Sequence, residues 1–189
     1  QKNLDDAENW QVYHHKNTSA PETDYLTLNT TNATGDQSSR WNDTAPTSTL
    51  ITIGSDSSVS QSGESMVMYA WSEVQAFSKF GTYIGNASTD GTFCYTGFKP
   101  AWVFCKKSSS SGNWNITDTK RNTGNPHGKQ IEANSSGAEF DNVRLDILSN
   151  GFKHRATGSD LNGSGTTYIY VAFAEAPFVN SEGVPCTAR

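Results

Sequence analysis

Two glutamates are the side chains most suggestive of catalysis, because each ends a matching apolar run. Glu73 lies at the end of the run 66–74, and Glu175 lies at the end of the run 168–176. Two carboxylates within about 10 Å across a groove can act as acid and base in glycoside hydrolysis. The two glutamates, however, occupy the same place in two copies of one pattern, so duplication explains them without chemistry. The sequence therefore predicts a structural role for the pair and no catalytic residue.

Histidines and acidic loops could hold a metal ion, but their spacing does not favour one. Adjacent side chains on a strand point to opposite faces, so His14 and His15 should not chelate together. The loops 55–58 and 86–91 contain aspartates without the spacing of a calcium loop. No nucleophile elbow, phosphate loop or dinucleotide fingerprint is present. We expect no metal, no cofactor and no enzymatic activity; the histidines considered are His14, His15, His127 and His154.

One tryptophan could bind a ligand. Trp41 stands among polar residues, as aromatic side chains that stack on a sugar ring often do, with amide and carboxylate groups to bond its hydroxyls. Its equivalent in the second copy of the pattern lies near Leu145, so this tryptophan is not shared by the two copies. The alternative interpretation is a core tryptophan that closes one end of the first lobe. The candidate ligand-binding residues are Arg40, Trp41, Asn42 and Asp43.

The composition favours strands and loops to position these residues. Ser and Thr total 44, and with 16 Asn and 16 Gly they make up 76 of the 189 residues. Such side chains compete with helical hydrogen bonds and favour turns and exposed strand faces. The net charge of −5 gives no basic surface for nucleic acid, and no apolar run is long enough to cross a bilayer. Three cysteines, Cys94, Cys105 and Cys186, lack metal-ligand spacing and are expected to be core residues.

An internal repeat organises the chain. Trp10 begins a stretch that reaches Gly63 after 53 residues, and Trp114 begins one that reaches Gly165 after 51. In both copies an apolar run and a glutamate follow, which indicates duplication. Trp10 and Trp114 are therefore expected to be core anchors.

The repeated pattern predicts an all-β fold with little helix. Short apolar or alternating segments recur about every ten residues between turn residues, as in a β-sandwich. We expect duplicated β-sandwich lobes of jelly-roll or lectin-like type, with a central strand at 168–173 and a hairpin turn at 149–152. Residues 1–78 should form a first, incomplete lobe, and residues 79–189 a second, complete one. We also expect that residues ahead of Gln1 supply the missing strand of the first lobe, within a longer protein.

Several long motifs carry a family resemblance. They are the strings Ser78–Asn86, Asp90–Phe93, Tyr95–Val103 and Phe173–Phe178. Together they resemble a C-terminal domain of tail-fibre-like and other virion structural proteins of marine bacteriophages, which often follows concanavalin-like lectin domains. The first copy, from Trp10 to His15 and around Trp41, is similar to the preceding part of the same family.

The resemblance implies a component of the virion surface. It carries no established active site, so the expected function is a non-enzymatic module of a fibre, spike or other appendage that contributes to host attachment. The expected partners are a host-surface glycan or receptor and other virion proteins, with a homo-oligomer, first of all a trimer. The alternative is a lectin-like carbohydrate-binding module of a secreted or cell-surface protein. No nucleic acid and no membrane insertion are expected.

Overall fold

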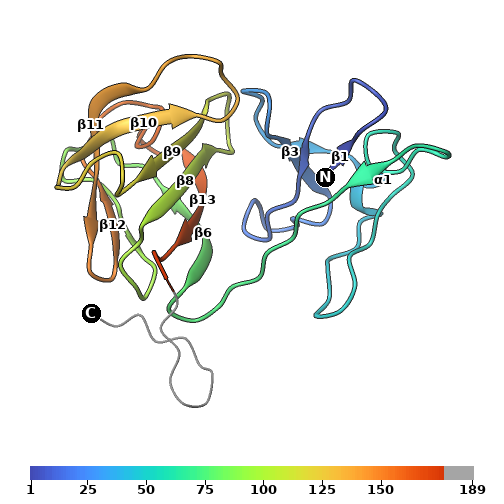
Figure 1. Ribbon diagram of the computed structural model, residues 1–189, viewed down its shortest axis with the longest axis horizontal. Helices are drawn as coiled ribbons and strands as arrows, with labels where there is room; N and C mark the ends of the chain where they lie inside the picture. The colour runs from blue at the N-terminus through green and yellow to red at the C-terminus, as the bar shows by residue number, and fades with distance from the viewer. Residues whose placement is uncertain (177–189) are drawn as a thin grey trace.

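The computed structural model describes residues 1–176, with the side chain of Val143 left aside, and it confirms the all-β fold (Figure 1). Cys186 lies outside the described residues. We call residues 1–74 unit 1 and residues 78–176 unit 2; the predicted division at residue 78 stays a prediction. Unit 1 contains β1 (Lys2–Asn3), β2 (Gln11–Val12), β3 (Asp24–Thr27), β4 (Gly35–Asp36), the short helix α1 (Ser38–Trp41) and β5 (Met66–Val67).

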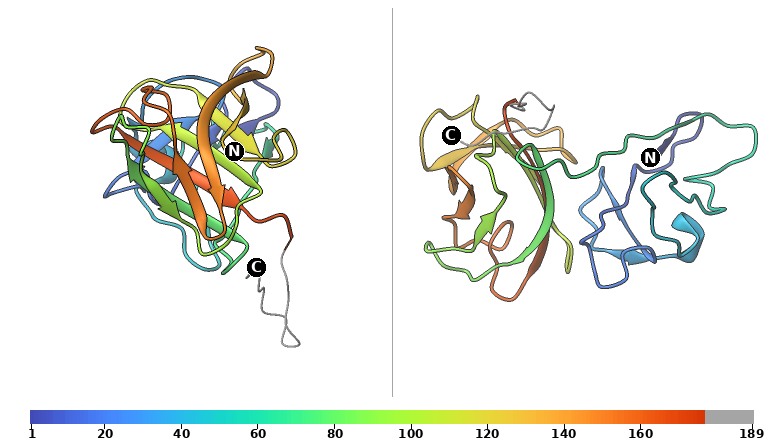
Figure 2. Two further views of the ribbon diagram at one scale, coloured as in Figure 1. Left: turned by 90° about the vertical axis from the view of Figure 1, so that its left-hand side faces the viewer. Right: turned by 90° about the horizontal axis from the view of Figure 1, so that it is seen from below.

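Unit 2 is one antiparallel sheet that curls on itself. Its strand order is β6-β13-β8-β9-β10-β11-β12-β7, so β6 and β7 form the two edges of the sheet. The curvature seen in Figure 2 brings these edges toward each other. The strands are β6 (Ser78–Ile84), β7 (Phe93–Tyr95), β8 (Trp102–Lys107), β9 (Trp114–Asp118), β10 (His127–Glu132), β11 (Phe140–Leu148), β12 (Gly151–His154) and β13 (Thr167–Phe173).

Aromatic side chains fill the inside of the curled sheet. Tyr83 of β6 stacks on Tyr168 of β13, with ring centroids 4.9 Å apart, and on His154 of β12 at 4.5 Å. Phe152 meets Tyr170 edge to face at 5.2 Å. These contacts join the edge strand β6 to β12 on the far side of the core, so the sheet encloses its own apolar interior.

Alternation along β13 gives this strand two buried faces. Tyr168, Tyr170 and Ala172 point into the core of unit 2, whereas Ile169 packs with Leu26 of unit 1. The strand lies between β6 and β8, which confirms the predicted central strand. The predicted hairpin turn is also confirmed, since Leu148 pairs with Gly151 at the start of β12.

The two units meet along a continuous seam. The indole of Trp114 donates to the carbonyl of Thr27 at 2.9 Å, and its ring packs with Leu26 and Ile169. At one end of the seam the amide of Gly112 donates to the carbonyl of Thr31 at 2.9 Å. Unit 1 is therefore docked on the outer face of the unit 2 sheet.

The two units share one strand register. The pairs Lys2–Val67 and Asn3–Met66 of β1 and β5 match the pairs Lys106–Ile169 and Lys107–Tyr168 of β8 and β13. The β2–β3 ladder matches the β9–β10 ladder, and the β3–β4 ladder matches β10–β11, with offsets of 104 or 105 residues. Every strand pair of unit 1 thus has a counterpart in unit 2.

A clasp of asparagines fixes the register of the matching hairpins. In unit 1 the side-chain oxygen of Asn29 accepts from the amide of Trp10 at 2.9 Å, and its nitrogen donates to the side chain of Asn9 at 2.8 Å. In unit 2 Asn134 makes the same two bonds, to the amide of Trp114 and to the side chain of Asn113, at 2.7 and 2.9 Å. A shift of either hairpin by one residue would break both bonds.

Candidate functional site

A hollow of about 670 Å³ opens on unit 1. Its surface is mainly apolar, and it includes the side chains of Leu50, Tyr69 and Trp71, each more than half accessible. Contiguous apolar surface of this kind in soluble proteins marks an interaction site. The lining residues lie in the ranges 10–15, 44–52 and 68–73, together with Gln1, Leu28, Trp41 and Phe80.

Three aromatic rings form a ladder beside this hollow. Trp10 stacks on Tyr69, with centroids 6.3 Å apart and planes 21° apart, and Tyr69 stacks on Trp71 at 6.1 Å and 26°. The expectation that Trp10 is a core anchor is wrong, because this residue is only partly buried, while its counterpart Trp114 is 2% exposed. An exposed ladder of this kind can stack on a planar or ring-shaped ligand or be covered by another chain segment.

Two titratable side chains that line the hollow, His15 and Glu73, lie close together. The Glu73 carboxylate accepts from the Lys79 ammonium at 2.8 Å and lies 3.9 Å from His15 Nε2. Burial raises the pKa of Glu73, but hydrogen bonds from Lys79 and from the Phe80 amide outweigh it, so its pKa lies below the usual value. Burial lowers the pKa of His15, against the attraction of Glu73. At neutral pH the wall of the hollow therefore carries an ionised carboxylate paired with a lysine.

The adjacent histidines lie differently from the prediction. They follow β2 in a turn and are not on a strand, so their rings stack, 5.6 Å apart and 17° between planes, and do not point to opposite faces. His14 accepts from the Lys16 amide through Nδ1 and reaches the Tyr170 carbonyl through Nε2 at 3.2 Å. Both ring nitrogens of His14 are thus occupied. Within residues 1–176 no group of three His, Cys, Asp or Glu side chains is placed to hold a metal ion.

The predicted ligand-binding residues do not converge on one surface. Trp41 is 4% exposed and donates its indole N–H to the carbonyl of Asp24 at 2.9 Å, so its ring lies in the core of unit 1 and only borders the hollow. Its repeat counterpart Leu145 is equally buried. Asn42 and Asp43 are exposed and have positive φ angles, as residues that end α1. This arrangement favours the core interpretation of Trp41.

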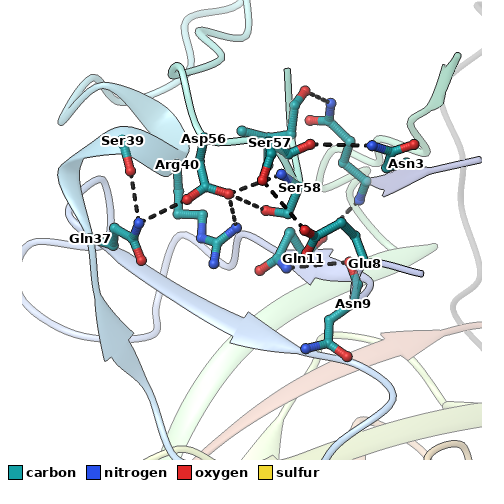
Figure 3. A network of polar contacts seen from close by, with 12 residues as sticks. Asn3, Glu8, Asn9, Gln11, Gln37, Ser39, Arg40, Asp56, Ser57 and Ser58 are labelled. Carbon is teal, nitrogen blue, oxygen red and sulfur yellow. Dashed lines mark hydrogen bonds and ion pairs between the residues drawn. The ribbon is translucent and has the colours of Figure 1, made fainter. Parts of the chain in front are cut away.

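Arg40, the fourth predicted residue, belongs to a separate polar network (Figure 3). Its guanidinium donates to Asp56 at 2.5 Å and lies over the ring of Tyr25, 4.6 Å from the centroid. Asp56 also accepts from Gln37 and from Ser58. Burial raises the pKa of Asp56, but the hydrogen bonds from Ser58 and Arg40 outweigh it and keep its pKa low. The network joins α1 to the loop at 55–58 and leaves Arg40 engaged within unit 1.

The paired glutamates have separate cationic partners. Glu73 binds Lys79, whereas Glu175 forms an exposed ion pair with Lys120 after β13. The thiols of Cys94 and Cys105 are buried and free, in the core of unit 2. No helix within residues 1–176 has the length and apolar character needed to cross a membrane.

Sequence reasoning missed the aromatic ladder. The repeat matches the run 66–74 to the run 168–176 and thereby predicts the same strand in both copies, but in unit 1 only Met66–Val67 is in a strand. The sequence nevertheless contains a signal for the ladder. Tyr69 and Trp71 alternate with smaller residues, which places both rings on one face of the run, and this face is exposed unless another segment covers it.

The fold and the hollow define an all-β protein of two related units with an exposed aromatic surface on the first. The chain belongs to the family described as a domain of unknown function, DUF7483, which matches residues 1–177. No curated protein and no solved structure matches the chain.

Proposed function

We propose that this protein is a non-enzymatic structural module of a virion appendage, a fibre, spike or surface protein, that contributes to attachment to the host. The observation that carries the proposal is the shared strand register of the two units. Repeated units that dock through a continuous face build extended rigid bodies, because each unit buries its surface against its neighbour. The resemblance of Ser78–Asn86 and Tyr95–Val103 to phage appendage proteins supports the same proposal.

The seam between the units fits this mechanical role. Trp114 is buried between them, and Lys106, also fully buried, directs its ammonium toward the carbonyls of Lys107 and Thr31. A buried ammonium held by carbonyls from both units fixes their orientation. A module of this kind holds neighbouring parts of an appendage in a fixed orientation and needs no catalytic activity.

Particle composition tests the proposal directly. Virus particles purified from cultures in which the chain is produced should contain it, and antibodies against the protein should reduce adsorption of the particles to host cells. The chain's absence from purified particles would overturn the proposal. Light scattering of the full-length protein should give a homo-oligomer, with a trimer expected first; a monodisperse monomer would contradict that prediction.

A second candidate function is a lectin-like carbohydrate-binding module of a secreted or cell-surface protein. The ladder of Trp10, Tyr69 and Trp71 favours it, because exposed stacked aromatics beside a carboxylate suit a sugar ring and its hydroxyls. On a glycan array W71A should lose binding. Y95A is the matched control, because Tyr95 is equally exposed at 64% but lies on β7 of unit 2. Equal losses in both variants, or no glycan binding by the parent, would exclude this function.

A further inference from the structure

The strand β5 lacks the neighbour that its counterpart has. β13 pairs with β8 on one side and with β6 on the other, over seven residues. β5 pairs with β1 alone among the described strands, and over two residues. Because β5 and β13 share a register, the open edge of β5 is the position that β6 occupies in unit 2.

The exposed side chains of unit 1 are the counterparts of core residues. Met68 corresponds to Tyr170 by the offset of 102 that relates β5 to β13. Ile51 corresponds to Phe152, because the bond from the Gly54 amide to the Arg40 carbonyl matches that from the Arg155 amide to the Arg144 carbonyl. Tyr170 and Phe152 are 5% and 0% exposed, whereas Met68 and Ile51 are 37% and 44% exposed.

Residues 78–104 supply the cover in unit 2. Tyr83 of β6 lies against both Phe152 and Tyr170, at 6.5 and 6.4 Å, and Phe98 fills the same core with 1% exposure. Gly81 lets the Tyr170 ring cross β6, since a Cβ there would lie 2.5 Å from it. No counterpart of Tyr83 or Phe98 faces Met68 and Ile51 among the described residues, and the hollow lies where those side chains would be.

The connection of such a segment to unit 1 is also defined. The amide of Gln11 donates to the carbonyl of Gln1 at 2.8 Å, as the first rung of a ladder whose counterpart is the pair Cys105–Asn115. Gln1 therefore corresponds to Cys105, which Phe104 precedes within β8. A segment patterned on residues 78–104 and joined ahead of Gln1 would continue directly into β1.

We propose that the hollow of unit 1 is an open β-core that binds a β-segment with the pattern of residues 78–104 when such a segment is joined ahead of Gln1. The segment adds a strand to the open edge of β5, extends β1 backward, and covers Met68 and Ile51. The backbone of residues 68–71 then pairs with the added strand, as residues 170–173 of β13 pair with β6. This inference is independent of a role in virions, because it rests on the register and burial of the two units.

An N-terminal extension tests it. The protein is made with a copy of residues 75–104 fused ahead of Gln1, and hydrogen exchange is measured for the amides of residues 68–73. We expect exchange there to slow by at least about tenfold. The matched control carries Tyr83→Asp and Phe98→Asp in the copied segment only, because a carboxylate cannot be buried in an apolar core without a partner. Unchanged protection of β13 in both proteins shows that unit 2 is intact.

A cysteine pair tests the register. In unit 2 Gly81 faces Tyr170 across the β6–β13 ladder, so M68C should form a disulfide with a cysteine at the Gly81 position of the copied segment. A cysteine at the Ser88 position of the copy should not react with M68C. Equal exchange in the extended and control proteins, or cross-linking without regard to position, would overturn the proposal.

Discussion

A buried, neutral histidine should make this protein sensitive to acid. His154 of β12 is fully buried between Tyr83 and Phe152, and neither of its ring nitrogens has a hydrogen-bond partner among the described residues. Burial lowers the pKa of His154 from 6.5 to about 3. The folded protein therefore binds no proton at this site near pH 5, whereas the unfolded chain does.

The size of the effect follows from the difference in proton binding. Each pH unit below the unfolded pKa of 6.5 removes about 1.4 kcal/mol of stability until the folded pKa is reached. Above pH 6.5 the imidazole is neutral in both states, so proton binding at His154 costs the folded protein no stability. At about pH 5 the loss of stability reaches about 2 kcal/mol. His14, whose pKa burial lowers to about 4, should lose a similar amount.

Urea denaturation at about pH 8, 6.5 and 5 measures this loss. We expect H154L to keep the stability of the parent at pH 8, because leucine has a similar volume and leaves no unpaired polar atom. Between pH 8 and 5 it should lose about 2 kcal/mol less than the parent. H15L is the control, since His15 is exposed and its variant should keep the steep acid loss of the parent. Parallel stability profiles for H154L and the parent would refute the reasoning, as would a folded-state NMR titration of His154 near pH 6.5.

Three further predictions concern the packing of unit 2. G81A should destabilise the protein by about 1–3 kcal/mol in urea denaturation, because the new methyl group would meet the Tyr170 ring; G124A, at a site open to solvent, should cost less than half as much. W114F should cost about 1–3 kcal/mol, because the Thr27 carbonyl at the seam loses its donor, and unchanged stability would contradict the assigned bond. Burial raises the pKa of Cys105 to about 12, so iodoacetamide should label Cys105 only in urea; rapid labelling of the folded protein, located by peptide mass, would contradict its burial.

The strands of unit 2 were predictable from the sequence because its local patterns agree with its packing. Trp114 to Thr117 alternates and lies in β9, and the turn at Ser149–Asn150 connects β11 to β12. The order of the strands was not predictable. β6 and β13 are distant in sequence, and they become neighbours only when the sheet closes around its core. Apolar periodicity gives no information on which strand lies beside which.

The candidate site was harder to predict because burial depends on neighbours. Trp41 has polar neighbours in sequence, which suggested an exposed ring, yet the fold places it against Tyr13 and the Asp24 carbonyl. Trp71 lies in the run 66–74, which the repeat matches to the central strand at 168–173, yet it is 65% exposed. Both outcomes have one cause, since the chain segment that covers or uncovers a side chain lies far from it in sequence.

The repeated fold separates the residues that set register from those that fill a core. The asparagine clasp is the same in both units, at Asn29 and Asn134, because one of its two bonds goes to a backbone amide whose position the hairpin itself defines. The core counterparts differ, with tryptophan at position 41 where unit 2 has Leu145. A core side chain needs only to match the volume left by its neighbours, and these differ between a closed sheet and an open one. Shared register bonds with exchanged core volumes are therefore what a duplicated fold requires when one copy encloses its core and the other leaves its core open.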